Sequence, residues 1–490
     1  MATVVKYVSE DTITLFSNKT SNEVSCHLLW GDSLQLQEAL PATGRVKVKA
    51  RGRTGFVNTA HISDKALLEY YFIDVGQGDG ILIVTPDRKH IMIDGGYIRS
   101  KQVTKRNAAD FIDWKFARDY GKTKITIDVM MASHNDEDHY GGLWDMINPN
   151  ETKELQLTKV EVKNFYYAGV NWFEKNGKRG LGPIVNGFYT PLLDNKAALK
   201  KHLPGGSGAV ASGFTLQGQW RDFMSLVVEN IPVCERLSNK KNSNGFVPGF
   251  EPKPGKPSIK VLAPIEEVEG GKPALKKFTG ADAINTNGHS LLLRVDYGKT
   301  RVLLTGDLNS KSQRHILNFY QNNIQELACD LAKACHHGAD DCSLEFLSHL
   351  SAAATIISSG DNEGHNHPRP KIVAASAITG HKTIRDDRIV TPLIYSTEIA
   401  RSYKITEPET LKVSDPGPAE TFKPTNKKAE IQFTSSGQLR TRNLWKSMFV
   451  SGIVYGLVNV RTDGEKILCA TMSEKSGDWE IETFLSRFVV

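Results

Sequence analysis

The chain has 490 residues, more than one ordinary domain holds, so at least two folded units are expected. Its hydrophobic fraction of 40%, charged fraction of 24% and net charge of +6 predict a soluble globular protein that can accept an anionic partner without requiring one. Six cysteines without a Cys-x-x-Cys pair, a start unlike a signal peptide and no apolar run near the roughly 20 residues that span a bilayer predict a cytoplasmic protein without membrane segments.

Residues 1–66 are predicted to form a small all-β unit, because short alternating runs recur between turn-forming residues. Cations alternate along its last two runs, which favours either a solvated strand face or a patch that docks a polyanion or a protein. These cations are Arg45, Lys47, Lys49, Arg51 and Arg53. No metal-binding residue types cluster before residue 66, so we expect a separable unit that assists capture and carries no catalytic group.

From residue 70 the pattern changes to longer apolar runs. Strands are predicted at 71–75, 81–84 and 90–93, and glycines at 76–80 predict a tight turn between the first two. A Rossmann fingerprint needs a helix after such a turn, whereas here a strand follows. A helix is predicted over 107–114.

The stretch 133–142 places two histidines and two aspartates within six positions. It follows an apolar run, 125–132, that is predicted to be a buried strand, and it precedes a helix expected to begin at Leu143. Imidazole and carboxylate together suit Zn²⁺, Mn²⁺ or Fe, and a run this dense commonly holds two ions. A solvated acidic loop is the alternative, which the position after a buried strand disfavours. The candidate ligands are His134, Asp136, Asp138 and His139.

The region 150–280 is less regular, with one strand predicted over 160–167. The tract 239–257 is rich in Lys, Asn, Pro and Gly and predicts an exposed loop. This loop is either a plain surface insertion or a mobile lid over the site.

Apolar runs return after residue 258, each flanked by polar residues. Strands are predicted at 259–263, 290–295, 301–305, 331–335 and 355–359. The polar candidates beside these runs are His289, Asp307, His336, His337, His365 and His367.

Beyond about residue 405, runs at 429–433, 455–460 and 466–470 predict a small β-rich extension that caps the main domain. Asp463-Gly464 predicts a hairpin turn between the last two runs. The expected domains are therefore 1–66, 67–404 and 405–490.

The loop 134–139 resembles the metal-binding loop of the metallo-β-lactamase superfamily, whose usual form is His-x-His-x-Asp-His. Asp136 at the second histidine position, with Gly-Gly following, resembles the branch typified by the soluble hydrolase domain of the competence protein ComEC. Further motifs resemble this branch in the same order, at 72–79, 93–96, 287–290, 305–307, 336–338 and 367–368. The resemblance covers about 68–400 and implies an α/β protein with an αββα sandwich. The end of the N-terminal unit resembles a bacterial Src-homology-3-like barrel.

The resemblance also implies roles for the candidate residues. One ion is assigned to His134 and Asp136, the other to Asp138 and His139, and Asp307 bridges them. His336 is the choice for the late histidine ligand; His337 is the alternative ligand, or contacts the substrate, or serves as an acid. The groups assigned to catalysis are Asp138, His337 and Asp307. Three residues are further candidates, His289 as a ligand, His367 as a phosphate contact and Asp94 as a support of the metal loop.

The implied activity is metal-dependent hydrolysis by a phosphodiesterase or nuclease of single-stranded DNA, with a bridging hydroxide between two divalent ions. Asp136 in place of a histidine makes its site harder, which favours Mn²⁺ or Mg²⁺ relative to a three-histidine site, and Zn²⁺ remains a candidate. One alternative is a hydrolase of a small anionic metabolite or nucleotide. The other is a binding or scaffold protein with a vestigial metal site.

Overall fold

The computed structural model describes residues 4–489 with ten internal gaps, at 103–104, 361–366, 398–401, 407–410, 414–419, 423–429, 436–437, 444–448, 455–456 and 473–477. Between 402 and 454 it describes the backbone of strands and no side chains. The chain divides into two compact units, one of residues 1–400 with 456–490 and the other of residues 401–455. The three expected domains do not coincide with these units, and their boundaries stay predictions.

The second unit contains antiparallel strand pairs. They are β31 (Ser402–Thr406) with β36 (Phe449–Val454), β32 (Leu411–Val413) with β33 (Glu420–Phe422), and β34 (Glu430–Ser435) with β35 (Gln438–Asn443). The run predicted at 429–433 lies largely within β34.

The first unit begins with an antiparallel seven-stranded sheet in the order β3-β2-β6-β5-β4-β1-β7. Its strands are β1 (Val5–Val8), β2 (Thr12–Phe16), β3 (Val24–Leu29), β4 (Ser33–Leu36), β5 (Arg45–Ala50), β6 (Arg53–Asn58) and β7 (Ile62–Ser63). Val46 and Val48 of β5 are fully buried while Lys47 between them is exposed, as the alternation predicts. The predicted strands are confirmed, and the likeness to a Src-homology-3-like barrel stays a prediction.

A nine-stranded sheet follows in the order β20-β14-β12-β10-β9-β8-β37-β38-β39. Its strands are β8 (Leu68–Ile73), β9 (Ile81–Val84), β10 (His90–Ile93), β12 (Val129–Ala132), β14 (Asn164–Tyr167), β20 (Val233–Arg236), β37 (Leu457–Thr462), β38 (Lys466–Met472) and β39 (Trp479–Leu485). β10 and β12 run parallel, so their carboxyl ends lie at the same edge of the sheet.

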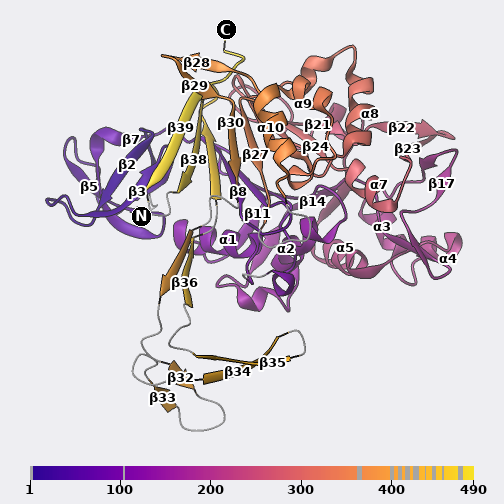
Figure 1. The fold of residues 1–490 in the computed structure, drawn as a ribbon, viewed down its shortest axis with the longest axis horizontal. Coiled ribbons are helices and arrows are strands. Elements are labelled where there is room, and N and C mark those ends of the chain that lie inside the picture. The colour runs from indigo at the N-terminus through magenta and orange to yellow at the C-terminus, as the bar shows by residue number, and fades with distance from the viewer. Residues whose placement is uncertain are drawn as a thin grey trace. The chain divides into compact units, whose positions relative to one another are not determined.

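The third sheet has six strands in the order β21-β24-β25-β26-β27-β30. They are β21 (Ser258–Ala263), β24 (Leu292–Tyr297), β25 (Thr300–Leu304), β26 (Leu331–Lys333), β27 (Ala354–Ile357) and β30 (Leu393–Ser396). One apolar core joins it to the nine-stranded sheet, because Phe72 and Ile91 of one sheet cluster with Val261, Leu293 and Ile356 of the other. The two sheets therefore pack face to face (Figure 1).

Helices cover the outer face of each sheet (Figure 1). On the nine-stranded sheet, Phe223 of α5 (Gly218–Asn230) packs against Phe165 of β14, and α1 (Ala108–Trp114) and α2 (Glu137–Ile147) lie beside it. On the six-stranded sheet, Ile316 of α8 (Ser310–Tyr320) and Phe346 of α9 (Leu344–Leu350) share a core with Leu303. The predicted αββα sandwich is confirmed, with α10 (Pro370–Thr379) on the same side as α8 and α9.

The last three strands lie within the main sheet. β37 and β38 form the hairpin predicted at Asp463-Gly464, and β37 pairs along β8, with Val460 opposite Tyr70. Figure 1 shows these yellow strands beside β8. The expected small cap is therefore, for residues 457–485, an extension of the nine-stranded sheet.

The N-terminal sheet packs tightly against this extension. Arg461 of β37 is fully buried. Its Nη2 donates to Asp32 Oδ1 at 2.7 Å, and its Nη1 donates to the Trp30 carbonyl at 2.6 Å. Leu29 shares an apolar cluster with Leu468 and Ala470. A buried guanidinium that depends on a carboxylate across the contact argues against the freely separable unit that the sequence predicts.

The tract 239–257 differs from the predicted exposed loop. Val247 is fully buried and Phe250 is 4% exposed, and both belong to the core between the two large sheets. The backbone N–H of Val247 donates to the Ile259 carbonyl at 2.9 Å. The tract is therefore anchored by two apolar side chains, and neither a loose insertion nor a mobile lid describes it.

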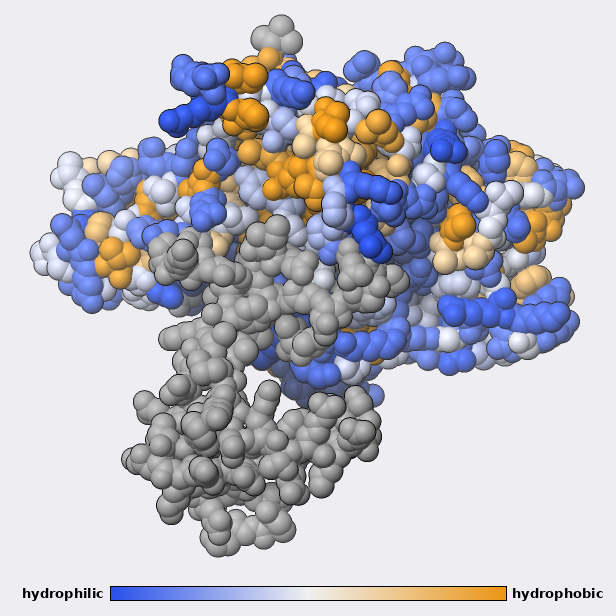
Figure 2. All heavy atoms as spheres, viewed as in Figure 1, coloured by the Kyte–Doolittle hydropathy of each residue, from blue (hydrophilic) through white to orange (hydrophobic). Residues whose placement is uncertain are grey.

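The face drawn in Figure 2 is mostly hydrophilic. Hydrophobic side chains gather there over α10 and the hairpin of β28 (Thr383–Arg385) and β29 (Arg388–Thr391), where Ile378, Ile384 and Ile389 are each more than two thirds exposed. Within the described parts of the chain, every helix is too short or too polar to cross a membrane.

Candidate metal centre

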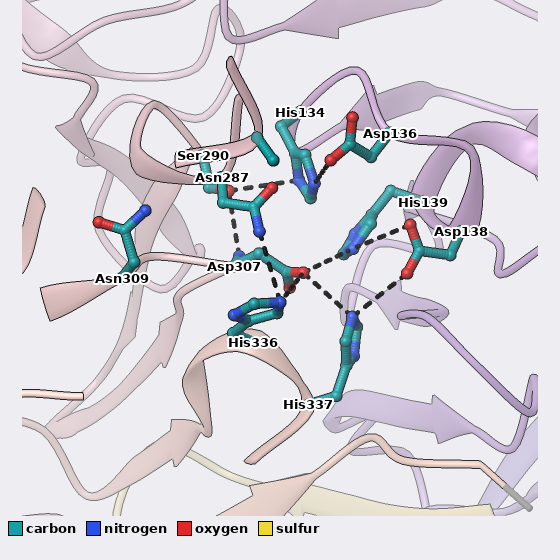
Figure 3. A network of polar contacts seen from close by, with 12 residues as sticks. His134, Asp136, Asp138, His139, Asn287, Ser290, Asp307, Asn309, His336 and His337 are labelled. Atoms are coloured by element: carbon teal, nitrogen blue, oxygen red, sulfur yellow. Dashed lines mark hydrogen bonds and ion pairs between the residues drawn. The ribbon is translucent and has the colours of Figure 1, made fainter. Parts of the chain in front are cut away.

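The candidate residues meet where strands of both large sheets end. Asp94 follows β10, residues 133–139 follow β12, Asp307 follows β25, and His336 and His337 follow β26. Parallel neighbours place their carboxyl ends at one edge, which is where open α/β sheets hold functional groups. Figure 3 shows the histidine and aspartate side chains converging on Asp307.

The loop after β12 is shorter than the sequence predicts. The helix α2 begins at Glu137 and includes Gly141 and Gly142, instead of starting at Leu143. A Cβ on Gly142 would lie 2.0 Å from the Gly95 carbonyl oxygen, and one on Gly141 would lie 2.4 Å from the Ile98 nitrogen. The two glycines therefore let α2 press against the segment after β10.

His139 is fully buried and fixed on both sides of its ring. Its Nδ1 lies 2.9 Å from Asp94 Oδ2, and its Nε2 lies 3.2 Å from Asp307 Oδ2. Asp94 also accepts from the Ser133 backbone N–H at 2.7 Å. The structure thus brings Asp94 behind the loop, where the family resemblance expects it.

His134 has the same arrangement with a hydroxyl behind it. Ser290 Oγ lies 3.3 Å from His134 Nδ1 and accepts from the Asp307 N–H at 3.0 Å. The Nε2 of His134 lies 3.6 Å from Asp136 Oδ2. Ser290 therefore links His134 to the loop that carries Asp307.

His337 is 1% exposed and points into the cluster. Its Nδ1 lies 3.2 Å from Asp79 Oδ1, and its Nε2 lies 3.1 Å from Asp307 Oδ2 and 3.6 Å from Asp138 Oδ2. The backbone at His337 takes a φ of 52°, in the left-handed region that non-glycine residues rarely adopt. This turn aims the ring at Asp307.

The inward atoms of these three histidines are buried without a hydrogen-bond partner. They are the Nε2 atoms of His134, His139 and His337, and Asp307 Oδ1 shares this state. Buried polar atoms in proteins are almost always paired, so such a convergent set points to a bound ion. Ligand atoms lie within 4.8 Å of one another in the groups His134–His139–Asp307 and Asp138–His139–His337. We call these five residues, with Asp136, the His–Asp cluster.

The electrostatics of the cluster favour positive charge. Burial opposes protonation of His139 and His337, but Asp307 and its neighbours outweigh burial, raising the pKa of His139 well above its usual value and that of His337 to about 10. Burial also opposes ionisation of Asp307, yet His139 and His337 hold the pKa of its carboxyl well below its usual range. Protons on the histidines and bound metal cations are therefore two ways to balance the negative charge of the buried carboxylates.

His336 lies at the side of the cluster. Its side chain is 31% exposed, its Nε2 lies 3.8 Å from Asp307 Oδ2, and it is absent from the close ligand groups found among the described residues. Its ring centroid lies 5.8 Å from that of His367. Both rings line a pocket of about 350 Å³ that opens on Asp136, Asp138 and Asp307. The geometry favours His337 over His336 as the late histidine ligand.

His289 does not reach the cluster, so its candidacy as a ligand is a correction. Its Nε2 lies 3.0 Å from the Lys276 carbonyl oxygen, and its ring stacks on Phe278 at 4.9 Å. Burial lowers the pKa of His289 to about 3, so the ring is neutral. His289 supports the fold at the start of β24, and His365 lies outside the described residues.

Sequence reasoning missed two residues of the site, Asp79 and Lys333. Lys333 is 1% exposed, and its Nζ lies 2.5 Å from Asp79 Oδ2 and 3.6 Å from Asp307 Oδ1. The Nζ also donates to the Gly306 carbonyl at 3.0 Å. The available signals were a lysine inside the apolar run 331–335 and an aspartate in the turn 76–80 between two buried strands.

No family model matches the chain. Two curated relatives match it: ComE operon protein 3 of Bacillus subtilis (strain 168), 29% identical over 108 residues, and Competence protein ComA of Neisseria gonorrhoeae, 31% identical over 105 residues. The matches cover 22% and 21% of this chain but only 13% and 15% of the relatives, so the chain spans a small part of their length.

Two solved structures align over most of their own length. A metal-dependent hydrolase of the beta-lactamase superfamily is 10% identical with a TM-score of 0.30, covering 67% of this chain and 95% of that one. Zn²⁺-bound PqqB from Methylobacterium extorquens is 8% identical with a TM-score of 0.29, covering 64% and 96%. With TM-scores this low, neither similarity carries an argument about the fold or the function of this chain.

The two face-to-face sheets between helices, with a His–Asp cluster at one edge, are the metallo-β-lactamase fold. The two sequence relatives match short stretches of the chain only, and these matches agree with the resemblance of its motifs to the ComEC-type branch.

Proposed function

We propose that this chain is a metal-dependent hydrolase that cleaves phosphodiester bonds in single-stranded DNA with two divalent ions held by the His–Asp cluster. The observation that supports it most is the shared orientation of three histidines. Each Nδ1 is held from behind, by Ser290, Asp94 or Asp79, and each Nε2 faces the carboxylates of the cluster without a well-formed hydrogen bond. Metal-binding histidines are characteristically oriented this way.

The ligand groups divide between two ions. Asp138, His139 and His337 form one close group, and His134 with Asp136 lies on the other side of Asp307, which reaches both. This division keeps the sequence-based roles of five residues and replaces His336 with His337. Imidazole with several carboxylates suits Mn²⁺ or Zn²⁺, with Mg²⁺ a weaker fit to the nitrogen donors.

Bound divalent ions supply Lewis acidity toward a phosphoryl oxygen and a water made nucleophilic near neutral pH. The chain's own side chains position the reacting groups and keep water away from them. Asp307, 2% exposed, sits between both ligand groups, and its backbone is held by Ser290. His336 faces the pocket beside Asn287, whose side-chain amide lies 3.4 Å from its Nε2. Burial lowers the pKa of His336, so a neutral imidazole is available to hold a proton or contact a phosphate.

The pocket supports a substrate that approaches along a flexible backbone. Its volume of about 350 Å³ holds roughly one nucleotide unit, and Tyr97 and Lys101 line its rim. A single strand can present one phosphate to such a hollow, whereas a duplex is stiff and wide. The relatives are competence proteins by name, and the ComEC-like resemblance implies DNA. The same small volume favours the second candidate, hydrolysis of a nucleotide or other small phosphodiester.

The test measures metal content and cleavage on the same samples. Elemental analysis after Mn²⁺ loading should find about two ions per chain, and labelled single-stranded oligonucleotide should be cut in preference to duplex DNA. The double variant His134→Ala, Asp138→Ala should lose both metal and cutting, while His349→Ala, outside the cluster, should keep both. Fewer than one ion with activity retained refutes the two-ion site. If only a small phosphodiester is cleaved, the second candidate function replaces the first.

A further inference from the structure

A second hollow lies between the N-terminal sheet and the helical side of the nine-stranded sheet. It encloses about 620 Å³ and shares no lining residue with the pocket at the His–Asp cluster. We call it the inter-sheet cleft. Tyr7 and Gln35 of β1 and β4 line one side, and Phe116 and Tyr120, which follow α1, line the other. Gln35 Nε2 donates to the Tyr120 carbonyl at 3.1 Å, which ties the two sides together.

The cleft carries an excess of positive charge. Four of its lining residues are cations, Arg88, Lys122, Lys124 and Lys163, and Asp128 is its one lining carboxylate; Arg88 is paired with Glu69, which does not line the cleft, at 3.2 Å. Asp128 is already satisfied, because it accepts from Lys163 Nζ at 2.7 Å and from the His90 backbone N–H at 2.9 Å.

The lysines at the mouth are available to a ligand. Within the described residues Lys122 makes no salt bridge, and its neighbour Lys124 pairs only with Glu161, where both side chains are about half exposed. Exposed pairs of this kind are weak and exchange readily for a better anion. An anionic group of one or two charges therefore fits the mouth of the cleft.

Aromatic rings that pack on one another form the inner wall of the cleft. Phe116 is 3% and Tyr120 8% exposed, and the His90 ring lies 4.7 Å from Phe116 and 5.5 Å from Tyr120 by centroids. Burial lowers the pKa of His90 to about 3, with Arg88 adding to the effect, so His90 contributes a neutral ring. These three rings are covered by one another, so Tyr7, half-buried on the opposite side, is the aromatic side chain within reach of a ligand.

We propose that the inter-sheet cleft binds a nucleoside phosphate, with its base against Tyr7 and its phosphate at Lys122 and Lys124. Aromatic platforms stack bases, and lysines at a rim hold phosphate. The volume lies within the roughly 300–1,000 Å³ usual for small-ligand sites. The source is either a free nucleotide or the terminal nucleotide of a strand. The proposal is independent of metal chemistry in the His–Asp cluster.

Calorimetric titration of the full chain with the four ribonucleoside monophosphates, with 5′-phosphorylated oligothymidylate and with inorganic phosphate tests this. The cleft variant is Lys122→Glu with Lys124→Glu. The matched control is Lys200→Glu with Lys201→Glu, two exposed lysines of α3 (Lys196–His202) that make the same change of charge. Binding of a nucleoside phosphate should weaken at least about tenfold in the cleft variant and stay unchanged in the control.

A third variant separates the ring from the charge. Tyr7→Ser should weaken nucleotide binding while leaving the weak binding of inorganic phosphate unchanged. Binding of the monophosphates assigns the cleft to free nucleotides, and binding of the oligonucleotide alone assigns it to a strand end. No saturable binding, equal binding by the cleft and control variants, or phosphate binding as tightly as the nucleotides would each overturn the proposal.

Discussion

Replacing Lys333 with methionine removes the buried cation that stands between two carboxylates of the site. The Lys333 and Asp79 side chains are 0% and 1% exposed, and Nζ lies 2.5 Å from Asp79 Oδ2 and 3.6 Å from Asp307 Oδ1. Breaking a buried pair from one side leaves an uncompensated charge and costs about 3–5 kcal/mol of unfolding free energy. Methionine keeps the apolar stem, so little of that loss comes from a cavity.

Urea unfolding, followed by circular dichroism on metal-free protein, measures this loss. The matched variant Lys124→Met removes a lysine with an ion pair of the same 2.5 Å length that is half exposed, and it should leave the unfolding free energy nearly unchanged. Loading with Mn²⁺ should recover part of the Lys333→Met loss, because a cation returns among the same carboxylates. Equal effects of the two substitutions would refute the argument from burial.

Three further predictions follow from the same structure. His337→Ala should lower the metal content by one ion, whereas His336→Ala should keep both ions and lower turnover, as elemental analysis beside a cleavage assay will show. A shortened chain of residues 65–490 should melt at a lower temperature than the full chain by calorimetry, because Arg461 loses its buried partner, at about 3–5 kcal/mol. Burial raises the pKa of Asp145 to about 6, so the neutral carboxyl stabilises the fold at low pH and this contribution is lost as pH rises through 6. Between about pH 4 and pH 8 the unfolding free energy of Asp145→Asn should therefore rise relative to that of wild type by up to about 3 kcal/mol, because each unit of pKa shift corresponds to about 1.4 kcal/mol. Urea titrations at both pH values measure this difference.

Local patterns were enough to predict most of the residues that the structure brings together at the sheet edge. Residues 133–139 and Asp307 each follow a run whose apolar character requires burial, and parallel strands bring such ends together. The order of the motifs then predicted two facing sheets, which the shared core confirms. These inferences worked because each depended on neighbours in sequence.

The misses all depended on distant partners or on backbone angles. No residue near Lys333 in the sequence predicts its ion pair with Asp79, which lies in a turn more than 250 positions earlier. The proposal of His337 in place of His336 as the ligand rests on two successive left-handed residues, with φ of 47° and 52°, that turn the second ring inward. The strands at 457–485 have the alternation of a free-standing sheet, and only pairing with β8 places them in the main one.

That pairing has a consequence for how the protein is made. β37 leaves the ribosome more than 380 residues after β8, so one edge of β8 waits without its neighbour while those residues are added. An unpaired strand edge is a template for association with other chains. Contacts this far apart in sequence also slow the search for the native fold. Ribosome stalling or early termination before residue 457 should therefore yield aggregation-prone chains even though every residue of the His–Asp cluster has already been added.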